Sequence, residues 1–209
     1  MSESKEPQFR EAADKGDLSL VKKLAPDTTL YLNWQGDIGI TAFSDACFEG
    51  RVSVVQFLLT LPTVDVNKPQ NQGATPFFIA CQKGHKEVVS LLLADMRIDL
   101  NKPKNDQCTP LWFASQNGHL PVVQLILASG REVDTKTKSI AGTADWSNKL
   151  AAEVARRQGN RAKPYDGESD EVFTRRMQNC LLIAILIESF EENPQQVRTR
   201  LRKHLGLKG

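Results

Sequence analysis

The stretch Asn71–Asn101 reads N-Q-G-A-T-P-F-F-I-A-C-Q-K-G-H-K-E-V-V-S-L-L-L-A-D-M-R-I-D-L-N. Thr75 can cap a helix that begins at Pro76, because a proline at the first helical position gives up no hydrogen bond. The helix is predicted to stop before Gly84, which can adopt the left-handed conformation of a helix end. Residues 86–94 then carry apolar side chains at helical spacing and predict a second helix. The stretch is therefore a predicted helix–turn–helix unit.

This unit recurs along the chain with a fixed period. Glycines stand 34 residues apart, at Gly16, Gly50, Gly84 and Gly118. Two further columns keep the same interval, namely Ala12, Ala46, Ala80 and Ala114, and Asn33, Asn67 and Asn101. Each predicted helix is too short to be stable alone in water, so neighbouring units must hold it. The pattern predicts a repeat array, which favours a binding scaffold over a catalytic pocket.

Two segments resemble the ankyrin repeat. They are T-P-F-F-I-A-C-Q-K-G-H at Thr75–His85 and T-P-L-W-F-A-S-Q-N-G-H at Thr109–His119, which are similar to the family pattern T-P-L-H-x-A-A-x-x-G-H. Thr41–Arg51 matches less closely, and residues 12–18 keep only A-A-D-K-G-D-L. The resemblance implies an all-α solenoid of helix–turn–helix repeats, joined by β-turns, that binds other proteins.

The resemblance divides the chain into repeats and a cap. We expect repeats at about residues 1–35, 36–69, 70–103 and 104–137, followed by a degenerate fifth repeat at 138–160. The fifth contains L-A-A-E-V-A-R-R-Q-G-N at Leu150–Asn160, after a polar loop over Lys136–Trp146. Residues 161–209 are expected to form an extended C-terminal helical cap.

The expected cap consists of two helices. Ser169 can cap a long helix, which Asn193-Pro194 would end. Its apolar part, Leu181–Ile187, is predicted to replace the second helix of the fifth repeat and to seal the end of the stack. A short basic helix over about residues 195–205 would follow. Most such helices dock on a neighbour, and the alternative is contact with an acidic partner or a membrane surface.

Two positions depart from the repeat pattern. Gln107 replaces the turn glycine represented by Gly39 and Gly73, which leaves the shape of that turn open. Lys23 stands in a column that is aromatic or aliphatic in the later repeats. A charge there predicts that this helix faces solvent, as a terminal repeat requires.

Charge and hydropathy exclude several classes of protein. Residues 1–135 hold 13 Lys or Arg and 16 Asp or Glu, a net −3, whereas residues 136–209 hold 14 and 9, a net +5. Neither value approaches the basic stripe of a nucleic-acid-binding protein, so no nucleic acid partner is expected. The longest apolar run is far short of the ~20 residues of a membrane span, and the N-terminus has no secretory signal. We expect a monomeric protein in the cytoplasm, with the nucleus as the alternative location.

No catalytic residue, metal or cofactor is predicted. Cys47, Cys81, Cys108 and Cys180 lack the spacing of a zinc or redox site and are expected to be free thiols. His85 follows a repeat glycine, where the ankyrin pattern itself has a polar residue. Nucleotide-binding loops and nucleophile motifs are missing, so the chain is predicted not to be an enzyme.

The resemblance implies a binding face made of the turn tips and the exposed ends of the first helices, on the concave side of the array. The predicted tip residues are Asp37, Ile38, Ile40, Asn71, Gln72, Ala74, Asn105, Asp106 and Cys108. The predicted helix-end residues are Phe48, Glu49, Gln82, Lys83, Gln116 and Asn117. We expect Ile38, Ile40 and Phe48 to form an apolar anchor, the alternative being that both isoleucines fold over Phe48.

Some positions have two interpretations. Phe78 and Trp112 occupy the histidine position of the pattern, where an aromatic ring either fills space between repeats or extends the binding site as a partly exposed anchor. Asn67 and Asn101 either stabilise their turns through hydrogen bonds or, by resemblance to animal ankyrin turns, are substrates of an asparaginyl hydroxylase.

The predicted function is a non-catalytic protein–protein interaction module. One alternative is a regulatory or inhibitory ankyrin protein that blocks a partner enzyme. Another is an adaptor subunit of a larger complex.

Overall fold

The computed structural model describes residues 4–140 and 149–207. Within these ranges the chain forms eleven α-helices and no strand, so the predicted all-α class is confirmed. The chain divides into two compact units, residues 1–105 and 106–209.

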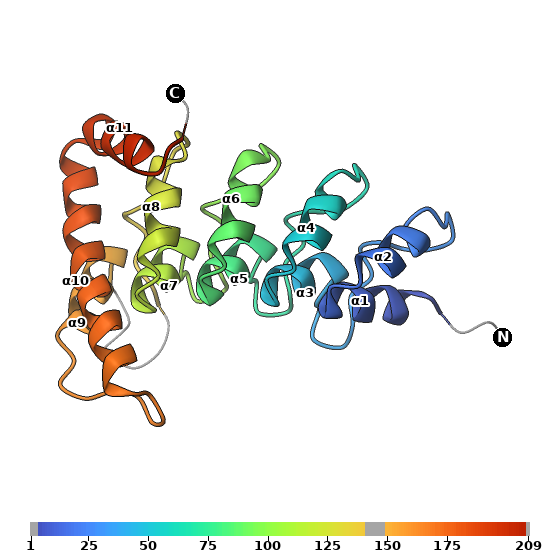
Figure 1. Cartoon of the computed structure of the whole chain (residues 1–209), viewed down its shortest axis with the longest axis horizontal. Helices are drawn as coiled ribbons and strands as arrows, with labels where there is room; N and C mark the ends of the chain where they lie inside the picture. Colours follow the sequence, from blue (N-terminus) through green and yellow to red (C-terminus); the bar gives the residue numbers. More distant parts are fainter. Residues whose placement is uncertain (1–3, 141–148, 208–209) are drawn as a thin grey trace. The chain divides into compact units, whose positions relative to one another are not determined.

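Unit 1 consists of three helix pairs (Figure 1). They are α1 (Glu6–Lys15) with α2 (Leu18–Leu24), α3 (Ala42–Phe48) with α4 (Val52–Leu59), and α5 (Pro76–Lys83) with α6 (Lys86–Ala94). The first helices pack in the order α1, α3, α5, and the second helices in the order α2, α4, α6. Neighbouring pairs within unit 1 therefore pack against one another.

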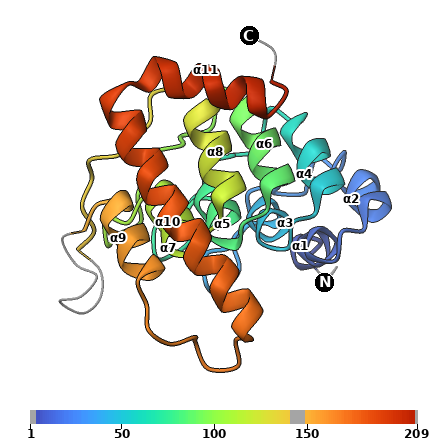
Figure 2. The ribbon, with the colours of Figure 1, turned by 60° about the vertical axis from the view of Figure 1, so that its left-hand side comes forward.

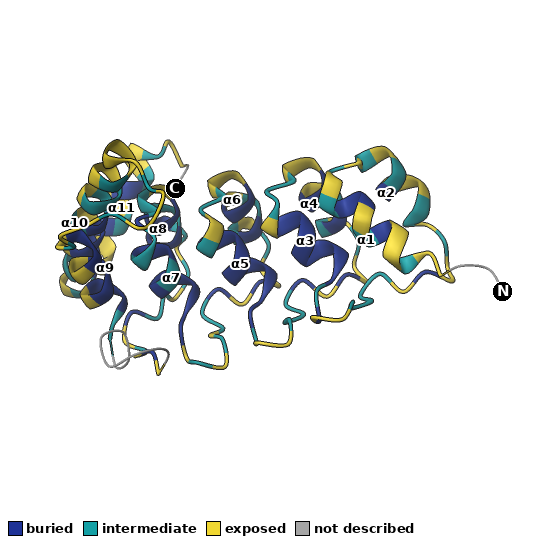
Figure 3. Cartoon of the chain, turned by 90° about the horizontal axis from the view of Figure 1, so that it is seen from below, coloured by how far each residue is buried: buried dark blue, intermediate teal, exposed yellow. Residues whose placement is uncertain are grey.

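Local sequence sets the helix ends of unit 1. The Thr75 hydroxyl accepts a hydrogen bond from the Phe78 amide at 3.2 Å, and Gly84 ends α5 at φ 78°. The limits predicted for α5 and α6 are therefore confirmed. Ala46 and Ala80 are fully buried, and their small side chains let adjacent first helices approach closely. In Figure 3, most of α3 and α5 is coloured as buried. Lys23, on α2, is exposed as its column predicts.

Asparagine side chains join the loops that follow the second helices. The side-chain Nδ2 of Asn33 donates to the Thr63 carbonyl at 2.8 Å. Its Oδ1 accepts a hydrogen bond from the backbone amide of Asp65 at 2.7 Å. Asn67 repeats both bonds one repeat later, to the Arg97 carbonyl at 2.6 Å and from the Asp99 amide at 2.8 Å. A structural role therefore accounts for Asn67, although its side-chain hydrogen bonds reach the next repeat rather than its own turn.

Unit 2 contains α7 (Pro110–Gln116), α8 (Leu120–Ala128), α9 (Ala151–Gly159), α10 (Asp170–Glu192) and α11 (Pro194–His204). α9 packs on α7, and α10 packs on α8 and α9. We interpret α9 and α10 as a fifth helix pair, because these are the contacts that a first and a second helix make in unit 1. Residues 141–146 of the predicted polar loop lie outside the described residues.

The terminal helix α11 docks on its neighbours. Figure 2 shows it crossing the ends of α10 and α8. Val197 and Leu201 are each only 4% exposed. Arg198 and Arg202 donate to the carbonyls of Arg131 and Ala128, both at 3.2 Å. These two apolar side chains of α11 therefore pack within the unit and are not available for insertion into a membrane.

A polar cluster holds the insertion between α9 and α10, which comprises residues 160–169. The guanidinium of Arg176 binds both carboxylate oxygens of Glu168, at 2.8 and 2.7 Å. It also donates to Gln158 at 3.3 Å, and Gln158 donates to the Tyr165 hydroxyl at 2.7 Å. The Tyr165 ring lies between Arg161 and Arg176, with 4.1 and 4.4 Å from its centroid to the two guanidinium carbons. These contacts attach the insertion to both helices.

Gln107 resolves the turn that the sequence left open. Gln107 has a φ of 61°. It is the only non-glycine residue with a positive φ among residues 4–140 and 149–207. The Ile140 amide donates to the Asp106 carbonyl at 2.8 Å, as tip residues of unit 1 do to the preceding tip. The turn thus keeps the shape that glycine gives elsewhere, at the conformational cost of a side chain in the left-handed region.

Gln107→Gly is therefore expected to raise the free energy of unfolding by about 1 kcal/mol, because glycine relieves this conformational cost. Urea unfolding followed by circular dichroism measures the change. The control is Gly73→Ala, which should lower the free energy of unfolding. Gly73 has φ 84°, and a Cβ there would collide with the side-chain oxygen of Asn105. A Gln107→Gly protein less stable than the original would contradict this account of the turn.

The Glu168–Arg176 pair predicts a pH dependence of stability. The hydrogen bond from Arg176 lowers the pKa of Glu168 from 4.5 to about 2. Because the folded state favours the charged carboxylate, the pair stabilises the fold fully above about pH 4.5, and this contribution is lost as the pH falls toward about 2. In urea titrations, the stability difference between the original chain and Glu168→Gln should shrink across this window. A difference that is independent of pH would show that the ion pair does not stabilise the fold.

Candidate partner-binding surface

Two turn tips of unit 1 are built by the same backbone hydrogen bonds. In the first tip, the Gly36 amide donates to the Ile40 carbonyl at 3.2 Å, and the Gly39 amide to the Gly36 carbonyl at 2.8 Å. In the second, residues 70–74 repeat these bonds at 3.0 and 2.8 Å. Each tip is thus a closed loop that leads directly into the threonine cap of a first helix.

Successive tips in unit 1 are joined to one another. The Asn71 amide donates to the Ile38 carbonyl at 3.3 Å, and its side chain to the Asp37 carbonyl at 3.2 Å. Asn105 makes the equivalent bonds to the carbonyls of Gln72, at 3.2 Å, and Asn71, at 3.4 Å. These bonds hold the tip backbones in register, and the side chains of Asp37, Ile38 and Gln72 remain exposed.

The predicted tip residues differ in exposure. Ile38 is 59% exposed. Asp37, Asn71, Gln72 and Asn105 are also exposed, and Ile40 and Asp106 are partly buried. Ala74 and Cys108 are buried, at 2% and 0% exposure, which corrects their assignment to the surface. Each precedes a capping threonine, where the chain turns back into the core.

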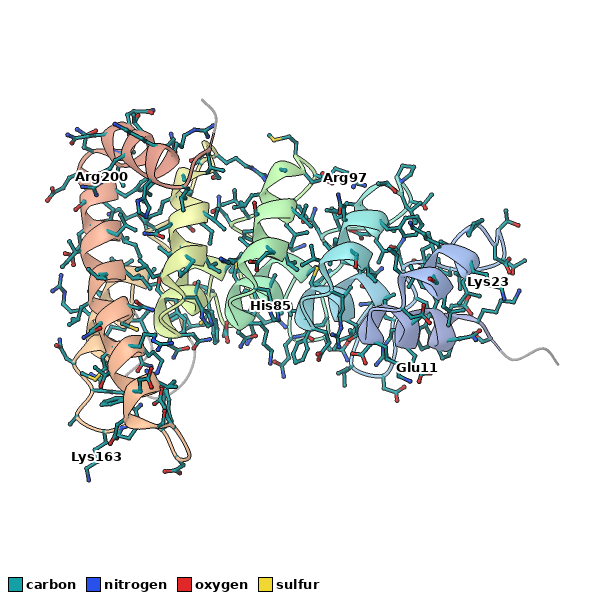
Figure 4. The ribbon with its side chains drawn as sticks, viewed as in Figure 1. Glu11, Lys23, His85, Arg97, Lys163 and Arg200 are labelled. Atoms are coloured by element: carbon teal, nitrogen blue, oxygen red, sulfur yellow. The ribbon has the colours of Figure 1, made fainter. Side chains whose placement is uncertain are left out.

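The predicted ends of the first helices are accessible. Phe48 is 39% exposed, and the ammonium of Lys83 lies 3.9 Å from its ring centroid. His85 Nε2 donates to the Phe48 carbonyl at 2.8 Å, which ties the start of α6 to the end of α3. Figure 4 labels His85 and Arg97 near the two ends of α6. Lys83 is exposed, and Glu49, Gln82, Gln116 and Asn117 are partly exposed.

The expected apolar cluster does not form. α3 has seven residues, which span about 10 Å at 1.5 Å per residue. Ile40 precedes the N-cap of this helix and Phe48 is its last residue, so the two side chains lie at opposite ends of α3. Neither a joint anchor nor shielding of Phe48 by the isoleucines describes the structure. Ile38 and Phe48 are two separate apolar spots.

Phe78 and Trp112 are core residues. Their exposures are 0% and 2%, so the interpretation of exposed anchors is wrong and that of space-filling rings is right. Trp112 Nε1 donates to the Lys149 carbonyl at 3.1 Å, and its ring packs edge-on against Phe113 with 5.1 Å between centroids. Both rings sit at the third position of a first helix, which in this fold is covered by neighbouring elements.

One polar feature of this surface was missed. Arg10 Nε lies 2.6 Å from Asp45 Oδ2, beside a cavity of about 310 Å³ that Glu11 and Asp14 also line. Burial raises the pKa of Asp45, and Arg10 opposes this effect. The available signal was a charge at position 45 in a column that is apolar in the later repeats, as at Ile79.

Chemistry at the cysteines is disfavoured by burial. All four cysteines are free and buried. Burial raises the pKa of the Cys180 thiol to about 11 and those of Cys47 and Cys81 well above the ordinary value. Across residues 4–140 and 149–207, no three His, Cys, Asp or Glu side chains gather as metal ligands. Nor does any helix in those ranges combine the length and apolar character of a bilayer span.

Repeated helix pairs, whose turn tips are joined by hydrogen bonds, define a helical repeat protein. The family model described as ankyrin repeats (3 copies) matches residues 9–102 and 43–137, together more than half of the 209 residues. The chain belongs to the ankyrin repeat family. No curated protein matches it. Ankyrin repeats are generally protein–protein interaction modules and are typically not catalytic.

The exposure of Phe48 predicts a small stability effect. Phe48→Ala should lower the free energy of unfolding by only about 1 kcal/mol, largely through the lost contact with Lys83. The control Phe43→Ala, on the same helix but at 2% exposure, should cost about 3–5 kcal/mol. Urea unfolding of both variants tests the difference. Equal losses would mean that Phe48 belongs to the core.

Proposed function

We propose that this protein binds a partner protein, without catalysis, through the tips and first-helix ends of its repeats. The observation that carries the proposal is the hydrogen-bonded row of tips in unit 1, which presents an Ile38 side chain that is 59% exposed. The proposed contact residues are Asp37, Ile38, Asn71, Gln72, Asn105, Phe48, Glu49, Gln82 and Lys83.

The physical argument is preorganisation. A surface whose backbone is already fixed loses little conformational entropy on binding, so more of the contact energy contributes to affinity. Ile38 supplies an apolar anchor, and the amide of Gln72 supplies a hydrogen-bonding group beside it. Glu49 and Lys83 add charges of both signs, which favour a partner of defined polarity over a generic anionic polymer.

Thiol chemistry supports a proposal for where the protein acts. We expect the partner in the cytoplasm or nucleus, because four free cysteines suit a reducing compartment. We expect the chain to act as a monomer. If the partner is an enzyme whose activity falls on binding, the inhibitory alternative applies. A partner with further binding proteins would instead support the adaptor alternative.

Ile38→Asp tests the proposed face. The whole chain serves as bait in a pull-down from its source cells with mass spectrometry, and the captured partner is then titrated by calorimetry. Loss of a central anchor should cost about 2 kcal/mol, which is about a 30-fold weaker Kd. The matched control is Met96→Asp, which introduces the same charge at an exposed apolar residue outside the proposed face, at 77% exposure. Equal affinity of both variants for the partner would refute the tip surface.

A further inference from the structure

Unit 2 contains a groove among its second helices and the terminal helix. The cavity measures about 390 Å³ and is lined by α8, α10 and α11. Its walls are mainly apolar, formed by Leu120 of α8, Leu182 and Ile185 of α10, and Leu201 of α11. We call this the α8–α10–α11 groove. It shares no residue with the surface proposed above.

Two aliphatic side chains in the groove are uncovered. Leu182 is 52% and Ile185 55% exposed, and their spacing of three residues puts them on one face of α10. By contrast, Ile183 and Ile187 on the opposite face are fully buried. Adjacent exposed aliphatic residues on a helix are typical of contact sites.

The wall formed by α11 carries a positive charge at Arg200. Arg200 and His204 line the groove one helical turn apart, and Lys203 beside them is exposed. Figure 4 labels Arg200 on α11. In the part of the chain that the structure describes, Arg200 has no ion pair, whereas Arg156 of the same unit binds Glu188 at 2.6 Å. None of the lining residues is acidic.

We propose that the α8–α10–α11 groove docks an amphipathic helix of a partner protein. The apolar face of this helix would pack on Leu182 and Ile185, and an Asp or Glu side chain would meet Arg200 and His204. A groove between two helices accepts the ridge of side chains on a third. The charge of Arg200 selects for an acidic helix over a basic one.

A membrane surface fits the groove less well. Interfacial binding needs apolar side chains that project from a helix lying in the interface. The apolar stripe of α11, Val197 and Leu201, is already buried, and the exposed aliphatic residues of α10 line a concavity. A helix can enter this concavity, whereas a bilayer surface cannot.

The test uses a library of 16-residue peptides displayed on phage and selected against the whole chain. Selected peptides are synthesised with a fluorophore, and their Kd is measured by anisotropy against the original chain, Leu182→Asp and Arg200→Glu. The matched control is Val172→Asp, on the same helix as Leu182 and equally exposed at 52%, but outside the groove.

We expect peptides with apolar residues at three- and four-residue spacing and at least one acidic residue. Leu182→Asp and Arg200→Glu should each weaken binding at least tenfold, whereas Val172→Asp should not. Replacing the acidic residue of the peptide by lysine should restore binding to Arg200→Glu, a gain that damage to the fold cannot produce.

Three results would overturn the proposal. The first is a selection that yields no peptide sensitive to Leu182→Asp. In the second, vesicles of phosphatidylserine and phosphatidylcholine bind the original chain but not the Arg200→Glu variant, which would assign the groove to a membrane. The third is a dimer in analytical ultracentrifugation that Leu182→Asp dissociates, which would make the groove an interface between two copies.

Discussion

The fold depends on the close approach of short first helices through a column of small residues. α3 and α7 have only seven residues each, too few to be stable alone. Ala46 and Ala114, at the middle of these helices, are completely buried. A larger side chain at either position would separate the helix from its neighbour and expose the apolar residues on both. Packing between repeats therefore provides the stability that the individual helices lack.

Hydrogen bonds between repeats add register to this packing. The tip bonds of Asn71 and Asn105 act at one end of each pair in unit 1, and the bonds of Asn33 and Asn67 act at the loops of the other end. Hydrophobic packing is not directional, whereas these bonds fix how far one pair can slide along the next. A fixed register is what allows tip side chains of successive repeats to form one surface.

Helix limits could be predicted from sequence because they depend on adjacent residues. Thr75, Gly84 and Ser169 act on the backbone within a few positions of themselves, and the structure places all three at helix ends. The burial of Phe78 and the distance between Ile40 and Phe48 depend instead on which surfaces neighbouring helices cover. A column of residue types shows that a position repeats, but it does not show which face of the helix is covered.

The same distinction applies to the groove in unit 2. The sequence showed that residues 181–187 are apolar on nearly every side, which fits a helix that covers the last repeat. A helix that only covers a repeat needs one apolar face, and its outer face is best polar for solubility. α10 has aliphatic residues on both faces, and α11, which could have covered the outer one, lies across its end. Leu182 and Ile185 thus exceed what closing the array requires, and this excess lies beside Arg200 of α11 in the proposed groove.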